Sequence, residues 1–153
     1  MEEVMNISVS MIVKNEESCI AQSLQSVSDA DEIIVCDTGS TDDTVEIARN
    51  YGAKVFTDYR WNDNFAEARN HSLDKCSGDW VLIIDADERL EPGGISKIRE
   101  LLLNGINGHS TVYFQTIAEG GIQSHSSIRL FKRNAGIRWK GVAHNYLTES
   151  KGY

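Results

Sequence analysis

Residues 80–88 read WVLIIDADE, and the rest of the predicted fold is arranged around this stretch. The uninterrupted apolar run from Trp80 to Ile84 has strand length and predicts a β-strand buried on both faces. It ends in Asp85 and Asp87, one residue apart. In open parallel sheets the ligand crevice lies outside the carboxyl ends of the strands, where two acids suit a divalent cation bound to a phosphorylated ligand. The alternative is an ordinary polar turn, since Asp is common in turns.

Four strands are predicted before residue 108, at residues 7–13, 32–36, 53–56 and 80–84, because each range is rich in β-branched or apolar side chains. The second strand runs into the turn Asp37-Thr38-Gly39-Ser40-Thr41-Asp42-Asp43, where Gly39 permits a backbone angle that other residues avoid. An acid therefore follows the second strand as well as the fourth. The alternative is that Asp37 and Asp42 are only turn and helix-start residues.

A helix is expected after each of these strands. The four helices are predicted after Glu17 to about Val27, from a Ser40–Asp43 capping box to about Tyr51, from Asn64 to near Gly78, and from Pro92 to about Asn104. In the last helix, Ile95, Ile98, Leu101 and Leu102 are spaced to share one buried face. Successive strand–helix units imply a parallel sheet with right-handed crossovers and with helices on both faces.

The pattern changes beyond Gly108. Residues 111–117 and 127–132 read as two further strands, joined by a Gly-rich connection through Glu119-Gly120-Gly121. We expect them to pair antiparallel or at a mixed edge of the sheet. The segment 137–147 is aromatic and basic, unlike the acidic body of the chain. No linker divides the sequence, so the 153 residues predict one domain with a single core.

Composition excludes several classes of protein. The net charge of -8 argues against a surface that binds nucleic acid, which needs clustered Lys and Arg. Three cysteines without CxxC spacing indicate neither a zinc site nor a disulfide framework, and suit a reducing cytoplasm. The acidic N-terminus is not a signal peptide, and no apolar run approaches the roughly 20 residues of a membrane helix. We therefore expect a cytoplasmic protein.

These motifs together resemble the family 2 glycosyltransferases, which have the GT-A nucleotide-sugar-binding fold. The matching segments are Lys14-Asn15-Glu16-Glu17 after the first strand, the turn from Asp37 to Asp42, Ala68-Arg69-Asn70, and Asp85-Ala86-Asp87 as the DxD motif. Arg129-Leu130-Phe131 and Trp139-Lys140-Gly141-Val142-Ala143-His144 also resemble a subgroup often found in cell-envelope glycan synthesis. The fold class implied is α/β and GT-A-like: a mostly parallel, Rossmann-like sheet flanked by helices, with an antiparallel C-terminal extension.

The resemblance implies roles for individual residues. Val13, Asn15 and Glu16 would surround the base and ribose of the donor, Asp37 would accept from a base N–H, which suits uracil, and Arg69 would lie near the base or the diphosphate. Ala86 separates two acids with different roles, because Asp85 would accept from the ribose and Asp87 would bind Mg²⁺ or Mn²⁺. His144 is a second candidate metal ligand, or else a packed histidine. Arg69 could equally be a solvated charge.

The resemblance also implies an inverting single displacement, in which a base deprotonates the acceptor hydroxyl. Where the subgroup has His followed by Glu, this chain has His144-Asn145, and an amide accepts no proton at neutral pH. The catalytic base is therefore unassigned among Glu149, Glu119 and a residue outside this sequence. Trp139 either lines an acceptor site or belongs to the core.

Residues 1–108 are expected to bind the donor and residues 109–153 to form part of the acceptor side. Family members continue further, so we expect this chain to be a piece of a longer protein. The acceptor would be a saccharide, a lipid-linked molecule or a protein, and a lipid acceptor or a partner would bring the domain to the inner face of the membrane. The oligomeric state is not predicted.

Two other functions stay open. One is a non-catalytic or truncated module that binds a nucleotide sugar without turnover. The other is a sugar nucleotidyltransferase, but that class has a Gly-rich loop with Arg after its first strand, and residues 11–17 contain none.

Overall fold

The computed structural model describes residues 5–106, 109–118, 121–142 and 146–148, with the backbone alone described up to residue 127 in the second and third ranges. Its elements are β1 (Ile7–Val13), α1 (Ile20–Ser26), β2 (Glu32–Asp37), α2 (Thr44–Asn50), β3 (Lys54–Phe56), α3 (Phe65–Lys75), β4 (Trp80–Ile83), β5 (Glu88–Leu90), α4 (Gly94–Leu103), β6 (His109–Ala118), β7 (Gly121–Lys132), a 3-10 turn (Arg133–Ala135), β8 (Arg138–Lys140) and β9 (Tyr146–Thr148).

Seven strands form one sheet in the described part of the chain, in the order β3-β2-β1-β4-β7-β6-β5. The strands β3, β2, β1 and β4 are parallel, as predicted. The strand β7 pairs antiparallel with β4, and β6 and β5 continue the sheet antiparallel beyond it. The chain winds from β1 outward to β3 and then returns to place β4 on the other side of β1. The carboxyl ends of β1, β2 and β4 therefore meet where the winding direction changes.

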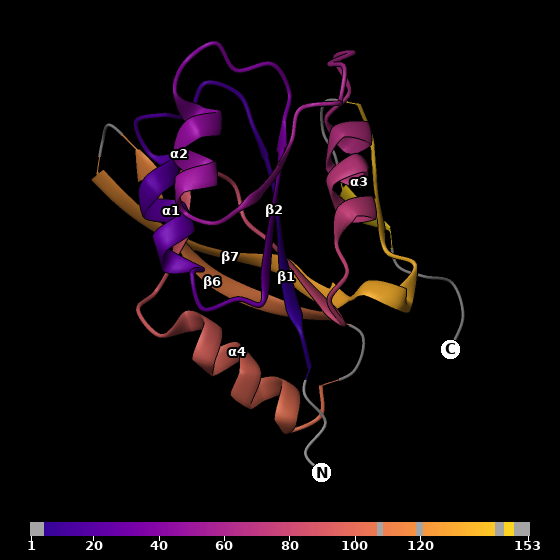
Figure 1. Ribbon diagram of the computed structural model, residues 1–153. Coiled ribbons are helices and arrows are strands. Elements are labelled where there is room, and N and C mark those ends of the chain that lie inside the picture. Colours follow the sequence, from indigo (N-terminus) through magenta and orange to yellow (C-terminus); the bar gives the residue numbers. More distant parts are fainter. Residues whose placement is uncertain (1–4, 107–108, 119–120, 143–145, 149–153) are drawn as a thin grey trace.

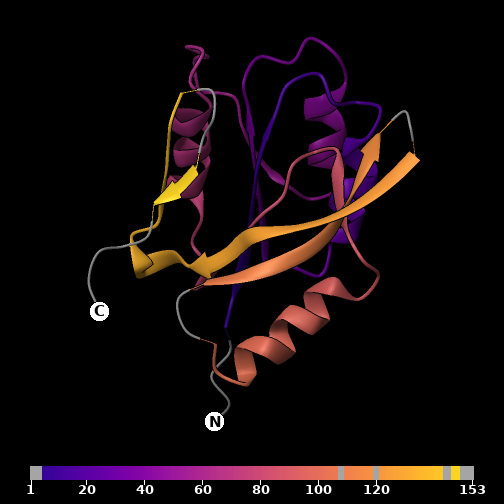
Figure 2. The same ribbon diagram turned by 180° about the vertical axis from the view of Figure 1, so that it is seen from behind.

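The central strands are buried on both faces. In β4, Trp80 and Leu82 point into one hydrophobic core and Val81 and Ile83 into the other. The first core is completed by side chains of α1, α2 and α4, and the second by side chains of α3 and of the segment that follows β7. Figures 1 and 2 show this layering, with α1 and α2 on one side of the parallel strands and α3 on the other. The alternating contacts explain why the sequence of β4 is apolar throughout.

The antiparallel part of the sheet is larger than the sequence predicts. The strands β6 and β7 are longer than the ranges 111–117 and 127–132, and they form a long hairpin (Figure 2). The three-residue strand β5 was not predicted, because Glu88-Arg89-Leu90 is too short to show an alternating pattern. It pairs with β6 directly after the two acids. The segment 85–87 is therefore held at both ends by strands of the same sheet.

Two local predictions were wrong. Ser40 and Asp43 do not form a capping box: α2 begins at Thr44, and the Ser40 hydroxyl instead accepts from the backbone N–H of Asn15. Leu101 does not lie on the buried face of α4, where Ile95, Ile98 and Leu102 pack against the core. The helix turns about 100° per residue, so Leu101 and Leu102 cannot both point to the centre of one narrow apolar stripe.

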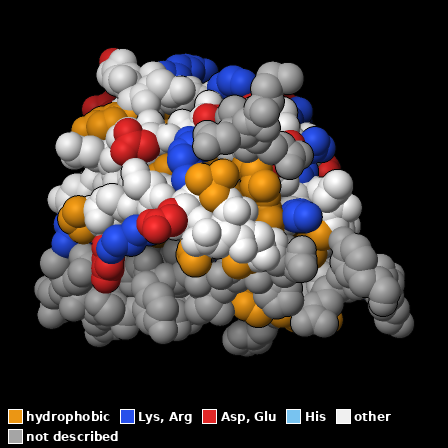
Figure 3. Space-filling view, turned by 90° about the horizontal axis from the view of Figure 1, so that it is seen from below, with side chains coloured by type: hydrophobic (Ala, Val, Ile, Leu, Met, Phe, Trp, Pro, Cys, Tyr) orange, Lys and Arg blue, Asp and Glu red, His pale blue; other side chains and the backbone are white. Residues whose placement is uncertain are grey.

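The surface carries charges of both signs. In the view from below, Lys and Arg side chains lie close to Asp and Glu side chains, and hydrophobic side chains are visible between them (Figure 3). Within the described residues, no helix has the length and hydrophobicity needed to cross a membrane.

The neighbouring leucines of α4 give a direct test of this packing. Leu102 is 2% exposed and Leu101 is 45% exposed. We expect Leu102→Ala to lower the free energy of unfolding by about 2–5 kcal/mol, because it removes buried methyl groups and leaves a cavity. The matched variant Leu101→Ala should change it by less than about 1 kcal/mol. Urea denaturation of both variants measures this, and equal losses would contradict the orientation of α4.

Candidate active site

Asp85 lies at the centre of a cluster of charges beyond the end of β4. Its Oδ1 atom is 2.9 Å from the Arg69 guanidinium of α3, and its Oδ2 atom is 3.9 Å from the Arg129 guanidinium of β7. Both arginine side chains are 14% exposed, so the charges attract one another with little screening by water. Asp85 is therefore oriented by two arginines, of which one precedes β4 in the sequence and the other follows it.

Glu88 completes this cluster, and its role was not predicted from the sequence. It is 3% exposed, and its Oε1 atom is 3.3 Å from the Arg129 guanidinium. Burial, a hydrogen bond with Asp85 and the negative charge of Asp85 raise the pKa of Glu88 to about 8. Burial alone would also raise the pKa of Asp85, but Arg69 and the hydrogen bond with Glu88 hold it below its usual range. At neutral pH, Glu88 is mostly protonated and donates to an ionised Asp85.

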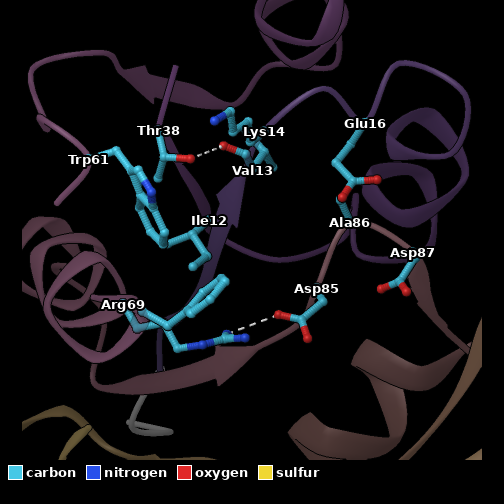
Figure 4. A pocket seen from close by; sticks show the side chains of 11 residues that line it. Ile12, Val13, Lys14, Glu16, Thr38, Trp61, Arg69, Asp85, Ala86 and Asp87 are labelled. Atoms are coloured by element: carbon cyan, nitrogen blue, oxygen red, sulfur yellow. Dashed lines mark hydrogen bonds and ion pairs between the residues drawn. The ribbon is translucent and has the colours of Figure 1, made fainter. Parts of the chain in front are cut away.

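The acidic cluster has the chemistry of a site for a hard divalent cation. Carboxylate oxygens of Asp85, Asp87 and Glu88 all lie within 4.8 Å of one another. Asp87 is partly exposed and lines the cavity, whereas Asp85, which also lines it, is bonded to Arg69 (Figure 4). Oxygen donors in such a group suit Mg²⁺ or Mn²⁺, which keep several waters or phosphate oxygens as further ligands. The residues present therefore fit the metal that the resemblance implies.

Hydrogen bonds connect the loop after β1 to the loop after β2. The Asn15 side chain accepts from the backbone N–H of Thr41 at 2.8 Å, and the Asn15 backbone N–H donates to Ser40 Oγ at 2.9 Å. Asn15 has a left-handed backbone with φ 51°, which Asn tolerates better than most residues. The backbone N–H of Glu16 donates to Thr44 Oγ1 at 2.8 Å. The side chain of Asn15 is thus used to join the loops.

Asp37 is buried and bonded to its own turn. Its carboxylate accepts from the backbone N–H groups of Gly39 and Ser40, both at 3.1 Å. Gly39, at φ 122°, adopts the angle that the sequence predicted for it. Thr38 continues from Asp37 and donates its hydroxyl proton to the Val13 carbonyl at 3.0 Å. The ends of β1 and β2 are therefore fixed to each other before any ligand binds.

A cavity of about 400 Å³ lies over these strand ends (Figure 4). It is lined by Ile12, Val13, Lys14, Glu16, Thr38, Trp61, Phe65, Arg69, Asp85, Ala86 and Asp87. Six of the eight predicted donor-site residues before residue 108 belong to this lining. The two others do not line it: Asn15 lies in the loop after β1, and Asp37 is the last residue of β2. His144 lies outside the described residues. Trp61 and Phe65 were not predicted to line the cavity, because the sequence does not indicate which way their rings point.

The Ala68-Arg69-Asn70 motif joins the cavity to the C-terminal segment. The Asn70 side chain donates to the Trp139 carbonyl at 2.9 Å and accepts from the Trp139 backbone N–H at 2.8 Å. The Arg69 guanidinium lies 4.7 Å from the centre of a Trp139 ring, within the range of a cation–π contact. Trp139 is 9% exposed and belongs to the second core. It also borders a second groove, which is lined by residues of both α3 and β8.

The model of the family described as Glycosyl transferase family 2 matches residues 8–148. The chain belongs to this family. The α/β fold, the acidic motif after β4 and the antiparallel extension are therefore those of a GT-A-like glycosyltransferase, as the sequence analysis expected.

Curated relatives agree with this assignment. The family 2 chain is 36% identical over 146 residues to a TPR repeat-containing protein of Synechococcus elongatus, covering 94% of this chain and 36% of the relative. It is 33% identical over 144 residues to the SPbeta prophage-derived glycosyltransferase SunS of Bacillus subtilis, covering 90% of this chain and 34% of the relative. The chain thus spans about a third of the length of these relatives.

Two solved structures have the same fold. Glucosyl-3-phosphoglycerate synthase from Mycobacterium tuberculosis, solved with Mn²⁺, UDP and glucosyl-3-phosphoglycerate, is 33% identical with a TM-score of 0.57, covering 69% of this chain and 42% of that one. S. aureus TarS 1-349 in complex with UDP-GlcNAc is 26% identical with a TM-score of 0.58, covering 64% of this chain and 31% of that one. Both structures were solved with a nucleotide or a nucleotide sugar bound, and both share the fold of the family 2 chain.

The raised pKa of Glu88 predicts a pH-dependent stability. Because the folded-state pKa of about 8 lies above the ordinary value of 4.5, Glu88 contributes its full stability below pH 4.5 and loses it as the pH rises through 8. In wild type, the unfolding free energy should fall between about pH 5 and pH 9. We expect this fall to be smaller by about 2–4 kcal/mol in Glu88→Gln, which keeps a donor to Asp85 but has no titrating carboxyl. Urea denaturation at a series of pH values, with a chelator to remove divalent cations, measures the fall. Glu100→Gln, at an exposed position of α4, is the control, and an equal decline in Glu88→Gln and wild type would contradict the pKa.

Proposed function

We propose that this chain is the donor-binding domain of an inverting glycosyltransferase that moves a sugar from a UDP-sugar to an acceptor hydroxyl. The observation that carries the proposal is the cavity at the carboxyl ends of β1, β2 and β4, which has Asp85 and Asp87 on its wall. The family match and the Mn²⁺ and UDP in the complex of glucosyl-3-phosphoglycerate synthase support it.

The role of each acid follows from its surroundings. Asp87, which faces the cavity, would hold Mg²⁺ or Mn²⁺, and the bound cation would stabilise the charge on the departing diphosphate. Asp85 is kept ionised and oriented by Arg69 and Arg129, so it suits a hydrogen bond from the ribose hydroxyls. Ala86, between them in the sequence, is buried and adds no polar group to the site. Glu88, protonated at neutral pH, would orient Asp85 and stay out of the metal's first contacts.

The nucleoside would lie over β1 and β2. Val13 and Glu16 line the cavity; Val13 would contact the base and Glu16, which lies toward the acids, the ribose, while Asn15 would act by shaping the loop. Asp37 accepts two backbone N–H groups, and a carboxylate has lone pairs for a further donor such as a uracil N–H. Arg69 is already engaged with Asp85, so we place it beside the ribose and the diphosphate.

Residues 109–153 would contribute to the acceptor side, and His144 would approach the metal from there. The base that accepts the proton of the acceptor is not assigned, because Asn145 follows His144. This substitution is the observation that keeps a second function open: a module that binds the donor without turnover. The wider role that we propose is cell-envelope glycan synthesis in the cytoplasm or at the inner face of the membrane.

Metal-dependent binding of UDP tests the proposal. We expect wild-type protein to bind UDP more tightly with Mn²⁺ than without it, and Asp87→Asn to lose about tenfold or more of the Mn²⁺-dependent affinity, since a carboxylate ligand becomes neutral. Glu100→Gln removes one exposed carboxylate outside the cavity and should bind like wild type. Calorimetric titration measures all three. Wild-type protein that binds no nucleoside diphosphate with or without the metal would refute the proposal, and release of free sugar from a UDP-sugar would distinguish an enzyme from a binding module.

A further inference from the structure

The loop between β3 and α3 presents two aromatic side chains to the cavity. Trp61 lies in this loop and Phe65 is the first residue of α3, and both line the cavity. Their ring centres are 4.9 Å apart at an interplanar angle of 71°, an edge-to-face arrangement that aromatic rings favour. Phe65 is 44% exposed, and neither side chain belongs to one of the two hydrophobic cores. The fold core therefore does not account for their position.

The loop is held in this conformation by its own polar contacts. Trp61 Nε1 donates to Asp63 Oδ1 at 3.0 Å, and Asp63 has a left-handed backbone with φ 59°. The Asn62 side chain donates to Glu67 Oε2 at 2.9 Å, and the Phe65 backbone N–H donates to the Val142 carbonyl at 3.2 Å. The hydrogen bond of Trp61 is made by Nε1 at the edge of its indole and so occupies neither face of the ring. The loop is thus prepared to present an aromatic surface without first having to order.

The two ends of the cavity differ in chemistry. Figure 4 shows Trp61 on one side of the cavity, Ile12 between, and Asp85, Asp87 and Glu16 on the far side. A nucleoside diphosphate has the same division, since its base is a flat aromatic ring and its phosphates need a cation to approach carboxylates. Because the two ends differ, only one orientation of a bound nucleoside diphosphate places its base against Trp61 and its phosphates beside Asp87.

We propose that Trp61, in edge-to-face contact with Phe65, stacks on the nucleobase of the donor and so sets the direction in which the nucleotide lies. This inference rests on the proposed function and adds to it the residue that holds the base. Base–aromatic stacking tolerates any base, because every base has a π-face. Trp61 therefore supplies affinity, and discrimination among bases is left to polar groups such as Asp37.

Two probes separate stacking from a structural role of the loop. UDP with Mn²⁺ carries a base, whereas pyrophosphate with Mn²⁺ has the charged part alone. We expect Trp61→Ala to weaken UDP binding about 5- to 100-fold and to leave pyrophosphate binding unchanged, while Trp61→Phe keeps most of the UDP affinity. Tyr51→Ala removes an exposed aromatic side chain at the end of α2, outside the cavity, and should change neither. Calorimetric titration of each variant gives these dissociation constants.

Fluorescence gives a second measurement that does not depend on the alanine variant. The other two tryptophans, Trp80 and Trp139, are 2% and 9% exposed, so stacking at Trp61 should dominate a change on binding. UDP with Mn²⁺ should quench the emission of wild type, and this quenching should be absent in Trp61→Phe at saturating UDP.

The outcomes are distinct. Equal loss of UDP and pyrophosphate binding in Trp61→Ala would show that the loop acts structurally, and unchanged UDP binding would show that Trp61 does not touch the base. Either result overturns the stacking proposal and leaves the proposed function intact, because wild type still binds UDP. Wild type that binds neither probe would contradict both.

Discussion

The ionised Asp85 carboxylate, held between Arg69 and Arg129, is the interaction on which the candidate site depends. Arg69 comes from α3 on one face of the sheet and Arg129 from the antiparallel strand β7, so this one carboxylate ties both to the end of β4. Two guanidinium groups in such a partly buried place need compensating negative charge. Asp85 provides it, and Glu88, whose pKa is raised, avoids adding a second full charge beside it at neutral pH.

The arrangement separates two acids that look equivalent in the sequence. Asp85 is oriented by the protein, whereas Asp87 faces the cavity and offers its oxygens to a ligand. The different positions of the two acids depend on the strands on either side of the motif. β4 fixes the chain before Asp85, and β5 fixes it from Glu88 onward. The short strand that the sequence did not reveal is therefore part of what positions the motif.

The fold was predictable where the physical signal is local and repeated. The successive strand–helix units predicted the parallel sheet, and the acids at the ends of β2 and β4 predicted the edge where the site lies. Other features depend on tertiary contacts that leave no local pattern. Burial of Glu88 depends on the distant Arg129, Ser40 bonds to Asn15 instead of capping α2, and the rings of Trp61 and Phe65 turn inward because of contacts within their loop. Leu101 was wrongly assigned to the buried face of α4 because every apolar residue at helical spacing was included in that face.

The pairing of Asn70 with Trp139 has a consequence for divergence among related proteins. The Asn70 amide forms two hydrogen bonds with the backbone of Trp139, as a neighbouring strand would, and these bonds do not depend on which side chains β8 carries. Exposed side chains of β8, such as Lys140, can therefore change while β8 keeps its place beside α3. Evolution can then alter what this side of the molecule recognises while the geometry at Asp85 is inherited unchanged.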